Sequence, residues 1–242
     1  MWRQACVQPL STAKRATSAH KEGAQDHLSR TQRSKRLSHL LVTQTFIDKL
    51  IAVTVPLPPP LTQKIIREYG HNNFLILVSC LLSLRARDVV TIHVCRDLFE
   101  RIKTPQELCD MPREELERII YRTGYYKNKA RTLHEVSAAL IDRFSGAVPS
   151  RREELLSLPG VGPKTASLVL GLGFGIPAIC VDTHVHRISN LWGVVHTKTP
   201  EQTEVALEAA LPKKYWILWN YLLVVIGQNM RNKEIEALGA RP

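Results

Sequence analysis

The sequence predicts an all-α protein, and three observations lead to that prediction. Apolar residues recur at helical spacing from about residue 44 onward. No segment shows the apolar–polar alternation of a half-buried strand, and no internal repeat is present. Proline and glycine stand between the periodic segments, at positions where they end helices. With 242 residues, 44% of them hydrophobic, the chain can bury a substantial core.

The N-terminal segment differs from the rest of the chain in charge. Residues 1–36 carry eight Lys and Arg against two acidic residues, a net charge of +6 out of +11 for the whole chain. The segment is rich in Ser and Thr and has little apolar periodicity, so we expect residues 1–43 to form a basic, disordered tail. Two other interpretations stay open, an organelle transit peptide and a start codon assigned too far upstream.

About ten helices are predicted after this tail. The first begins near Gln44 and ends before the proline-rich residues 55–60. Residues 61–69 predict a short helix ended by Gly70, and the strongly apolar residues 74–84 predict a buried helix. The further predicted helices span residues 88–102, 113–121, 128–144, 150–157, 164–172, 182–191, 199–211 and 214–226, and Thr-Pro-Gln-Glu at residues 104–107 predicts the N-cap of another helix. We expect the polar residues 231–242 to be poorly ordered.

Residues 155–166, Leu-Leu-Ser-Leu-Pro-Gly-Val-Gly-Pro-Lys-Thr-Ala, form the segment richest in chemical information. Pro159 ends one short helix, and Gly160 and Gly162 permit backbone angles closed to other residues. The bare backbone N–H groups can then approach an anion closely. Pro163 suits the first position of the next helix, whose N-terminus carries partial positive charge. The turn therefore predicts a phosphate-binding hairpin, the alternative being a tight corner only.

A loop rich in Gly and Pro brings Asp182 to the start of a helix, eighteen residues after Lys164. Taken alone, Asp182 is explained as a helix N-cap and Lys164 as a solvated or phosphate-contacting side chain. Together, the Leu-Pro-Gly-Val-Gly-x-Lys-Thr-Ala run, the Val-Asp-Thr-His run and the spacing between them are specific enough to indicate a protein family. Over residues 60–229 or so, the sequence resembles the helix-hairpin-helix, Gly/Pro-rich-loop, Asp superfamily of base-excision DNA glycosylases, and its endonuclease III branch in particular.

The resemblance implies a fold of two all-α domains and a DNA-repair activity. A six-helix barrel with the helix-hairpin-helix would span residues 66–176, and a smaller domain built from both chain ends would span 44–65 and 177–242. The implied enzyme is a bifunctional DNA glycosylase/AP lyase that removes oxidised pyrimidines from damaged duplex DNA. Lys164 would be the nucleophile that forms a Schiff base, and Asp182 its catalytic partner. The resemblance also implies a monomer.

Other site residues follow from the same motif match. The residues that it sets against DNA are Gly160, Val161, Gly162, Thr165, Arg85, Lys127 and Lys129. Many relatives carry Gln at the position of Arg85, which would fill the gap left by the flipped base or else contact a phosphate. Lys127 and Lys129 would add affinity without choosing the lesion. Asp88 would support the site or cap the next helix, and His184 would orient neighbouring backbone or be structural.

The cysteines predict that no cofactor is bound. Endonuclease III relatives continue past the Gly-Gln-Asn match into four Cys spaced C-x6-C-x2-C-x5-C, which ligate an iron-sulfur cluster. Here Met230 stands at the first of those positions and no Cys follows Cys180, so we expect neither the cluster nor another metal. The five dispersed Cys indicate free thiols in a reducing intracellular compartment, the cytoplasm and nucleoid, or the nucleus or mitochondrion in a eukaryote. No run of 18 apolar residues indicates a membrane span.

Two alternatives to this function remain. The same lyase chemistry could act on another lesion, such as 8-oxoguanine or a mismatched thymine. The chain could instead be a non-catalytic helix-hairpin-helix DNA-binding protein. The combination of Lys164 and Asp182 favours an enzyme, because phosphate binding requires neither residue.

Overall fold

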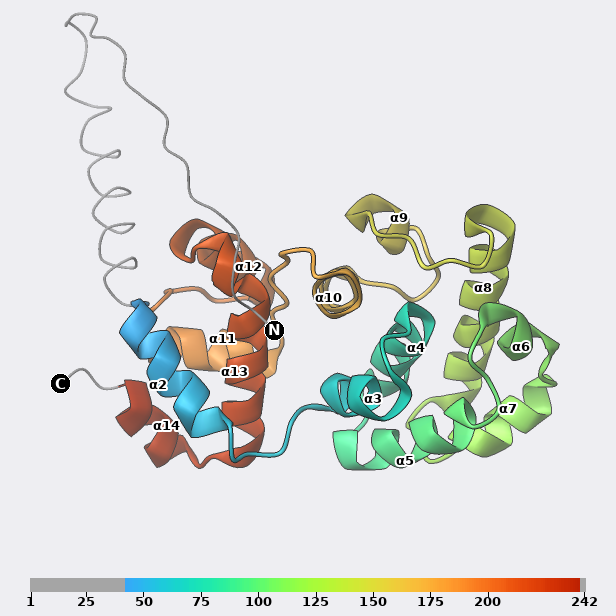
Figure 1. Cartoon of the computed structure of the whole chain (residues 1–242), viewed down its shortest axis with the longest axis horizontal. Helices are drawn as coiled ribbons and strands as arrows, with labels where there is room; N and C mark the ends of the chain where they lie inside the picture. Colours follow the sequence, from blue (N-terminus) through green and yellow to red (C-terminus); the bar gives the residue numbers. More distant parts are fainter. Residues whose placement is uncertain (1–41, 240–242) are drawn as a thin grey trace, which may run out of the picture.

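The structure is a computed structural model that describes residues 42–239. The described residues form helices and no strand, which confirms the all-α prediction. Figure 1 shows the helices gathered into two groups, with α10 (Pro163–Leu168) lying between them. Each group surrounds its own cluster of buried apolar side chains.

The first group is built around one apolar helix. Its members are α3 (Leu61–Tyr69), α4 (Asn73–Ser83), α5 (Asp88–Phe99), α6 (Pro105–Asp110), α7 (Arg113–Ile120), α8 (Tyr126–Phe144) and α9 (Arg152–Leu156). Every residue of α4 from Phe74 to Leu82 is buried, because helices pack around it on all sides. Asn72 caps α4 by accepting from the N–H groups of Phe74 and Leu75. Thr104 opens α6 with the predicted capping box.

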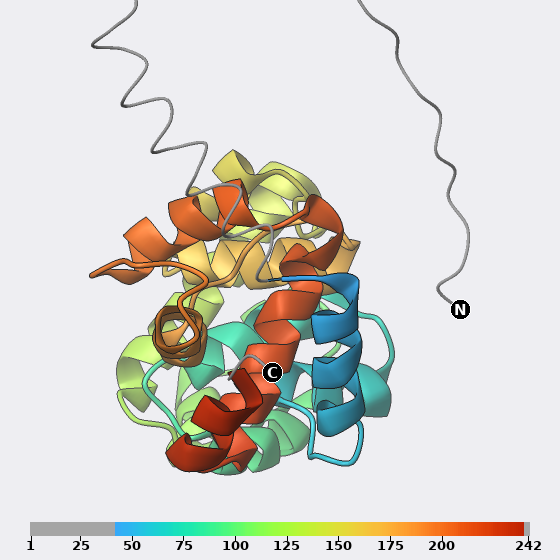
Figure 2. The same cartoon turned by 90° about the vertical axis from the view of Figure 1, so that its left-hand side faces the viewer.

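The second group joins the two ends of the described chain. Its members are α2 (Gln44–Thr54), α11 (Thr183–Leu191), α12 (Pro200–Ala210), a 3₁₀ turn (Lys213–Tyr215), α13 (Trp216–Asn229) and α14 (Asn232–Gly239). Trp219 of α13 is fully buried at the centre and donates from its indole nitrogen to Ser189 Oγ at 3.1 Å. Figure 2 shows α2 lying alongside α13. Lys49 of α2 donates to the carbonyl of Leu238 in α14 at 3.0 Å.

The boundaries of the two cores differ from the predicted domain limits. Leu61 and Ile65 pack in the first core, although the predicted barrel begins at residue 66. The proline-rich residues 56–60 cross between the groups, so the change of core falls at α3 itself. Val42 is buried in the second core and Thr43 caps α2, so these two residues belong to the folded part. The rest of the predicted tail, residues 1–41, lies outside the described residues.

The prediction that residues 231–242 are poorly ordered is wrong for residues 232–239, which form α14. Ile235 and Leu238 stand on one face of this helix and are buried in the second core. Trp192 Nε1 also donates to the carbonyl of Ile235 at 2.8 Å. Two apolar residues in a polar segment are too few to reveal a helical period, yet they suffice to dock a helix on an existing core.

The predicted helix 164–172 also changes type along its length. α10 ends at Leu168 and the chain continues as a π-helix, Val169–Gly173. The carbonyl of Gly173 is bonded to the His71 ring at 2.6 Å instead of to a later N–H group of the helix. Gly173 also packs so closely on Asn73 that a Cβ would lie 2.9 Å from its Oδ1. These contacts tie the end of the π-helix to the first group.

Candidate active site

The hairpin between α9 and α10 requires glycine at one of its two glycine positions. Gly160 has a φ of +70°, and a Cβ there would lie 2.5 Å from Thr132 Cγ2. Gly162 has a φ of −94°, which any residue adopts, and a Cβ there would meet open space. The expectation that both glycines use special angles is therefore wrong for Gly162. Gly162 precedes α10 and Pro163 occupies its first position, as predicted.

The other two hairpin residues point their side chains inward. Val161 packs in the first core, and Thr165 is also buried. The N–H group of Val161 already donates to the carbonyl of Leu158 at 3.2 Å. Gly160 and Gly162 are exposed, so the outer surface of the hairpin is mainly backbone.

One pocket contains both Lys164 and Asp182. The exposed Lys164 reaches it from the first turn of α10, and the half-buried Asp182 from the start of α11. The pocket lies between the two groups of helices. Its remaining walls come from both groups and are formed by Pro60, Leu61, Thr62, Gln63, Ser83, Asp88, Leu168, Leu172, Cys180, Asn220, Tyr221, Val224 and Gln228.

The carboxylate of Asp182 is held at a defined place by helix capping. Its Oδ1 accepts from the N–H group of Val185 at 2.8 Å, so the residue caps α11 and also lines the pocket. The loop before it is tied on two sides. Asn220 of α13 donates to the carbonyl of Cys180 at 2.9 Å, and the Cys180 thiol donates to the carbonyl of Lys164 at 3.6 Å.

The thiol of this loop, Cys180, and the thiol of Cys80 in α4 are both buried. Burial raises the pKa of the Cys180 thiol far above its ordinary value, and it raises the pKa of the Cys80 thiol to about 11. Near neutral pH the Cys180 and Cys80 thiols therefore stay protonated and serve as apolar packing and weak hydrogen-bond donors. Neither supplies a thiolate nucleophile.

A hydrogen bond spans the pocket from one group of helices to the other. Gln228 Nε2 of α13 donates to Asp88 Oδ2 of α5 at 2.9 Å. Next to it, Asn229 Nδ2 donates to the carbonyl of Pro58 at 3.3 Å. The expected capping role of Asp88 is wrong, because Arg87 occupies the N-cap of α5 and no side chain caps that helix. Asp88 is instead the first helical residue, which leaves its carboxylate free to face α13.

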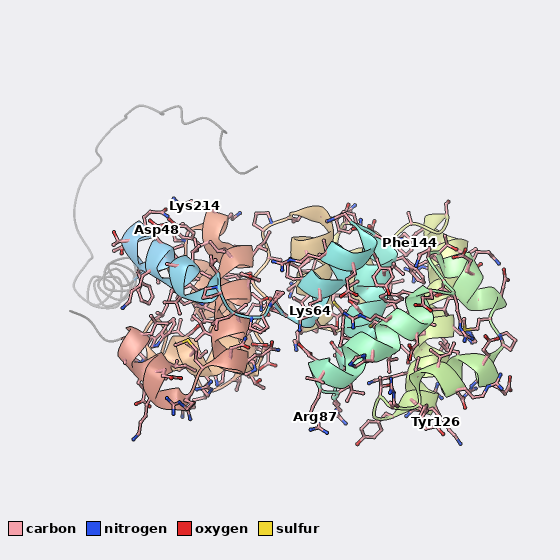
Figure 3. The ribbon with its side chains drawn as sticks, turned by 60° about the horizontal axis from the view of Figure 1, so that its bottom comes forward. Asp48, Lys64, Arg87, Tyr126, Phe144 and Lys214 are labelled. Carbon is pink, nitrogen blue, oxygen red and sulfur yellow. The ribbon has the colours of Figure 1, made fainter. Side chains whose placement is uncertain are left out.

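Arg85 and Tyr125 form a second feature at the edge of the first group. Both have left-handed backbone angles, with φ of 53° and 61°, and both are exposed. The Arg85 guanidinium lies over the Tyr125 ring, 5.7 Å from its centroid. Figure 3 shows the neighbouring residues Arg87 and Tyr126 along one edge of the first group, with Arg87 at the end nearer the second group.

The two lysines predicted to contact phosphate are placed differently. Lys127 is exposed on the same segment. Lys129 is half-buried and donates from Nζ to the carbonyl of Leu82 at 2.8 Å. Burial lowers the pKa of Lys129. Lys129 thus braces the turn after α4, close to Arg85.

His184 packs its ring against the backbone of α13. A Cβ on Gly227 would lie 2.3 Å from His184 Nδ1, so the ring occupies the space that a larger residue would fill. This contact places His184 behind Asp182, between α11 and α13. Sequence reasoning overlooked Gln228 and Asn220, and the polar residues that interrupt the otherwise apolar α13 were the available signal.

The described part of the chain offers no metal-binding group. Residues 42–239 contain no cluster of three or more His, Cys, Asp or Glu side chains that could hold a metal ion. The cysteines in this range, Cys80, Cys95, Cys109 and Cys180, are free. Burial raises the pKa of all four thiols. These residues do not fit the four-thiolate iron-sulfur cluster that endonuclease III homologues normally carry. None of the described helices is long and apolar enough to cross a membrane.

Comparison with known proteins identifies the family. Residues 78–213 match the HhH-GPD superfamily of base excision DNA repair proteins, and the chain belongs to it. Within that class, it is 44% identical to endonuclease III of Thermotoga maritima over 175 residues, which cover 70% of this chain and 82% of the relative. It is 37% identical to endonuclease III of Bacillus subtilis over 163 residues, 66% of this chain and 74% of the relative.

A solved structure of similar fold supports the same assignment. A trapped endonuclease III–DNA covalent intermediate, an estranged-adenine complex, aligns with a TM-score of 0.63 at 36% identity. The alignment covers 69% of this chain and 81% of the other. The chain is an endonuclease III-like base excision repair enzyme.

Proposed function

We propose that the protein is a bifunctional DNA glycosylase and AP lyase that removes oxidised pyrimidines from damaged duplex DNA. The observation that carries this proposal is the shared pocket, in which Lys164 and the capped carboxylate of Asp182 lie between two groups of helices. The base must leave the duplex to expose its glycosidic bond, and a pocket between domains accepts such a nucleotide.

The first chemical step breaks the glycosidic bond. The neutral amine of Lys164 attacks C1′ of the extruded nucleotide, and the electron pair of the C1′–N bond leaves with the base. The amine loses a proton and the departing base gains one from water. Opening of the sugar ring then breaks the C1′–O4′ bond, O4′ takes up the proton lost by the amine, and an iminium remains between Nζ and C1′. Asp182 takes the amine proton and stabilises the positive charge that develops on the sugar.

The second step cuts the strand. The iminium acidifies C2′, a proton leaves that carbon, and the C3′–O bond breaks with release of the 3′ phosphate. Water then hydrolyses the Schiff base and restores the lysine. This β-elimination distinguishes a bifunctional enzyme from a glycosylase that removes the base only.

The remaining site residues hold the DNA. The exposed hairpin of Gly160 and Gly162 approaches the backbone phosphates. Thr165 contributes only its main-chain N–H, and Val161 anchors the hairpin in the first core while its own N–H stays with Leu158. Arg85 fills the gap left by the extruded base, and Lys127 contacts a phosphate. These contacts place the scissile sugar over the pocket.

Three residues support the site without contacting the reacting atoms. Lys129 supports the turn at Arg85 through its bond to Leu82, and His184 supports the segment that carries Asp182. Asp88 forms part of the pocket wall. The protein works as a monomer without a cofactor. Its substrate places it where genomic DNA lies, in the cytoplasm and nucleoid, or in the nucleus or mitochondrion of a eukaryote.

Borohydride trapping tests this function. Hydride reduces the iminium to a stable amine, so the protein should become covalently bound to a duplex with an abasic site. Lys164→Ala should abolish the adduct, and Lys233→Ala, which removes an exposed lysine of α14, should leave it intact. An adduct that survives Lys164→Ala, or none with the unaltered protein, would overturn the proposal.

A lesion panel separates the substrates. Duplexes with thymine glycol should trap more protein than those with 8-oxoguanine or a G·T mismatch, and the reverse order would reassign the lesion. Asp182→Asn keeps a good N-cap but removes the negative charge. It should therefore slow the reaction about a hundredfold or more while the melting temperature changes little.

A further inference from the structure

The Gln228–Asp88 hydrogen bond determines which groups Gln228 presents to the pocket. A carboxylate only accepts hydrogen bonds, so the Gln228 amide must turn its NH₂ group toward Asp88 Oδ2, 2.9 Å away. The amide cannot reverse without setting its carbonyl oxygen against the carboxylate. This bond uses one N–H of the amide and leaves Oε1 and the second N–H available to a ligand in the cavity that Gln228 and Asp88 line.

An amide held in one orientation can distinguish pyrimidine bases by the order of hydrogen-bond donors and acceptors along their edges. The edge of a thymine-type base runs carbonyl, N3–H, carbonyl, so an oxygen set opposite N3 accepts its hydrogen, and the amide N–H reaches a carbonyl on either side. A cytosine-type edge has no hydrogen on N3 and would set two acceptors face to face. With N3 in this one place, a free amide could rotate to give a cytosine-type N3 a donor, whereas the held amide keeps its oxygen there.

We propose that Gln228, held by Asp88, reads the imide edge of the extruded base and so makes this enzyme prefer oxidised thymine-type bases over cytosine-type bases. This inference rests on the proposed function, since the base reaches the pocket only by extrusion. Gln228 is exposed at the pocket wall, so the edge of an incoming base can reach it. Gln228 stands on α13 and Asp88 on α5, so this hydrogen-bonded pair forms only when the two groups of helices are packed together.

The test compares single-turnover excision of thymine glycol and 5-hydroxycytosine from matched duplexes. Each rate is divided by the rate at which the same protein cleaves a preformed abasic site, which has no base to read. The unaltered protein should favour thymine glycol, and Gln228→Ala should lower that preference about tenfold. Asp88→Asn should lower it too, because an asparagine accepts either orientation of the Gln228 amide.

A matched control comes from another Gln–Asp pair. Gln106 donates to Asp110 Oδ1 at 2.9 Å on α6, outside the pocket, so Gln106→Ala should leave the preference unchanged. A preference that is absent in the unaltered protein, or unchanged in both pocket variants, overturns the inference. A protein that fails to cleave or trap on the abasic duplex overturns the proposed function instead, so the two failures are distinguishable.

Discussion

The thiol of Cys180 donates to the backbone carbonyl of Lys164, with 3.6 Å between sulfur and oxygen. This bond joins the loop that leads to Asp182 to the first turn of α10. Asn220 holds the same loop from the side of α13, at 2.9 Å. The relative positions of the proposed nucleophile and its partner therefore depend on two residues that carry out no chemistry.

Loss of the Asn220 contact should slow catalysis more than it destabilises the fold. Asn220→Ala removes the donor to Cys180, and we expect the rate on an abasic duplex to fall about tenfold because small displacements of reacting groups are costly. The free energy of unfolding should fall by about 1 kcal/mol. Cys109→Ala, at a half-buried thiol of the first group, serves as the control. A rate within twofold of the unaltered protein would show that the loop keeps its position without Asn220.

Gly160, at the hairpin between α9 and α10, should not tolerate a side chain. Gly160→Ala forces an L-residue into a φ of +70° and brings its Cβ to 2.5 Å from Thr132 Cγ2. We expect a loss of about 1–3 kcal/mol in urea unfolding. Adding Thr132→Ala should recover only the steric part of the loss. Gly162→Ala should cost less than 1 kcal/mol, and equal losses at the two glycines would contradict this account of the hairpin.

The C-terminal helix should contribute to global stability. Ile235→Asp sets a charge in the second core, where Ile235 is fully buried, and should cost about 3 kcal/mol or more. Ala237→Asp introduces the same charge at an exposed position of α14 and is the matched control. Urea unfolding measures both. Similar, small losses for the two variants would mean that α14 does not hold on to the core in solution.

Buried thiols should make the fold sensitive to alkali. Burial raises the pKa of Cys80 from 9.0 to about 11. The folded state therefore keeps a proton that the unfolded chain releases, and stability falls as the pH rises from about 9 through 11. Burial lowers the pKa of Lys129, which acts in the opposite direction. Urea midpoints across this range should fall less steeply for Cys80→Ala, and an unchanged slope would contradict the prediction.

Local signals were enough to predict most helices of this protein. The caps at Thr104 and Asp182 are present as predicted, because a cap depends on a side chain and an N–H group within three residues. The buried helix α4 could also be predicted, because its apolar residues are continuous in the sequence. The motif also marked Lys164 and Asp182 as members of one site, although their roles remain a prediction.

Packing between distant segments set the features that could not be predicted. Asp88 meets Gln228 across 140 residues, and that contact replaces the expected cap. Helix α14 forms because Trp192 and the second core receive Ile235, whereas its own sequence has only two large apolar residues. Such contacts depend on where two cores come to lie against each other. Short-range sequence patterns carry no information on that arrangement. The all-α class and the helix-hairpin-helix motif could therefore be predicted from the sequence, whereas most of the residues that line the pocket could not.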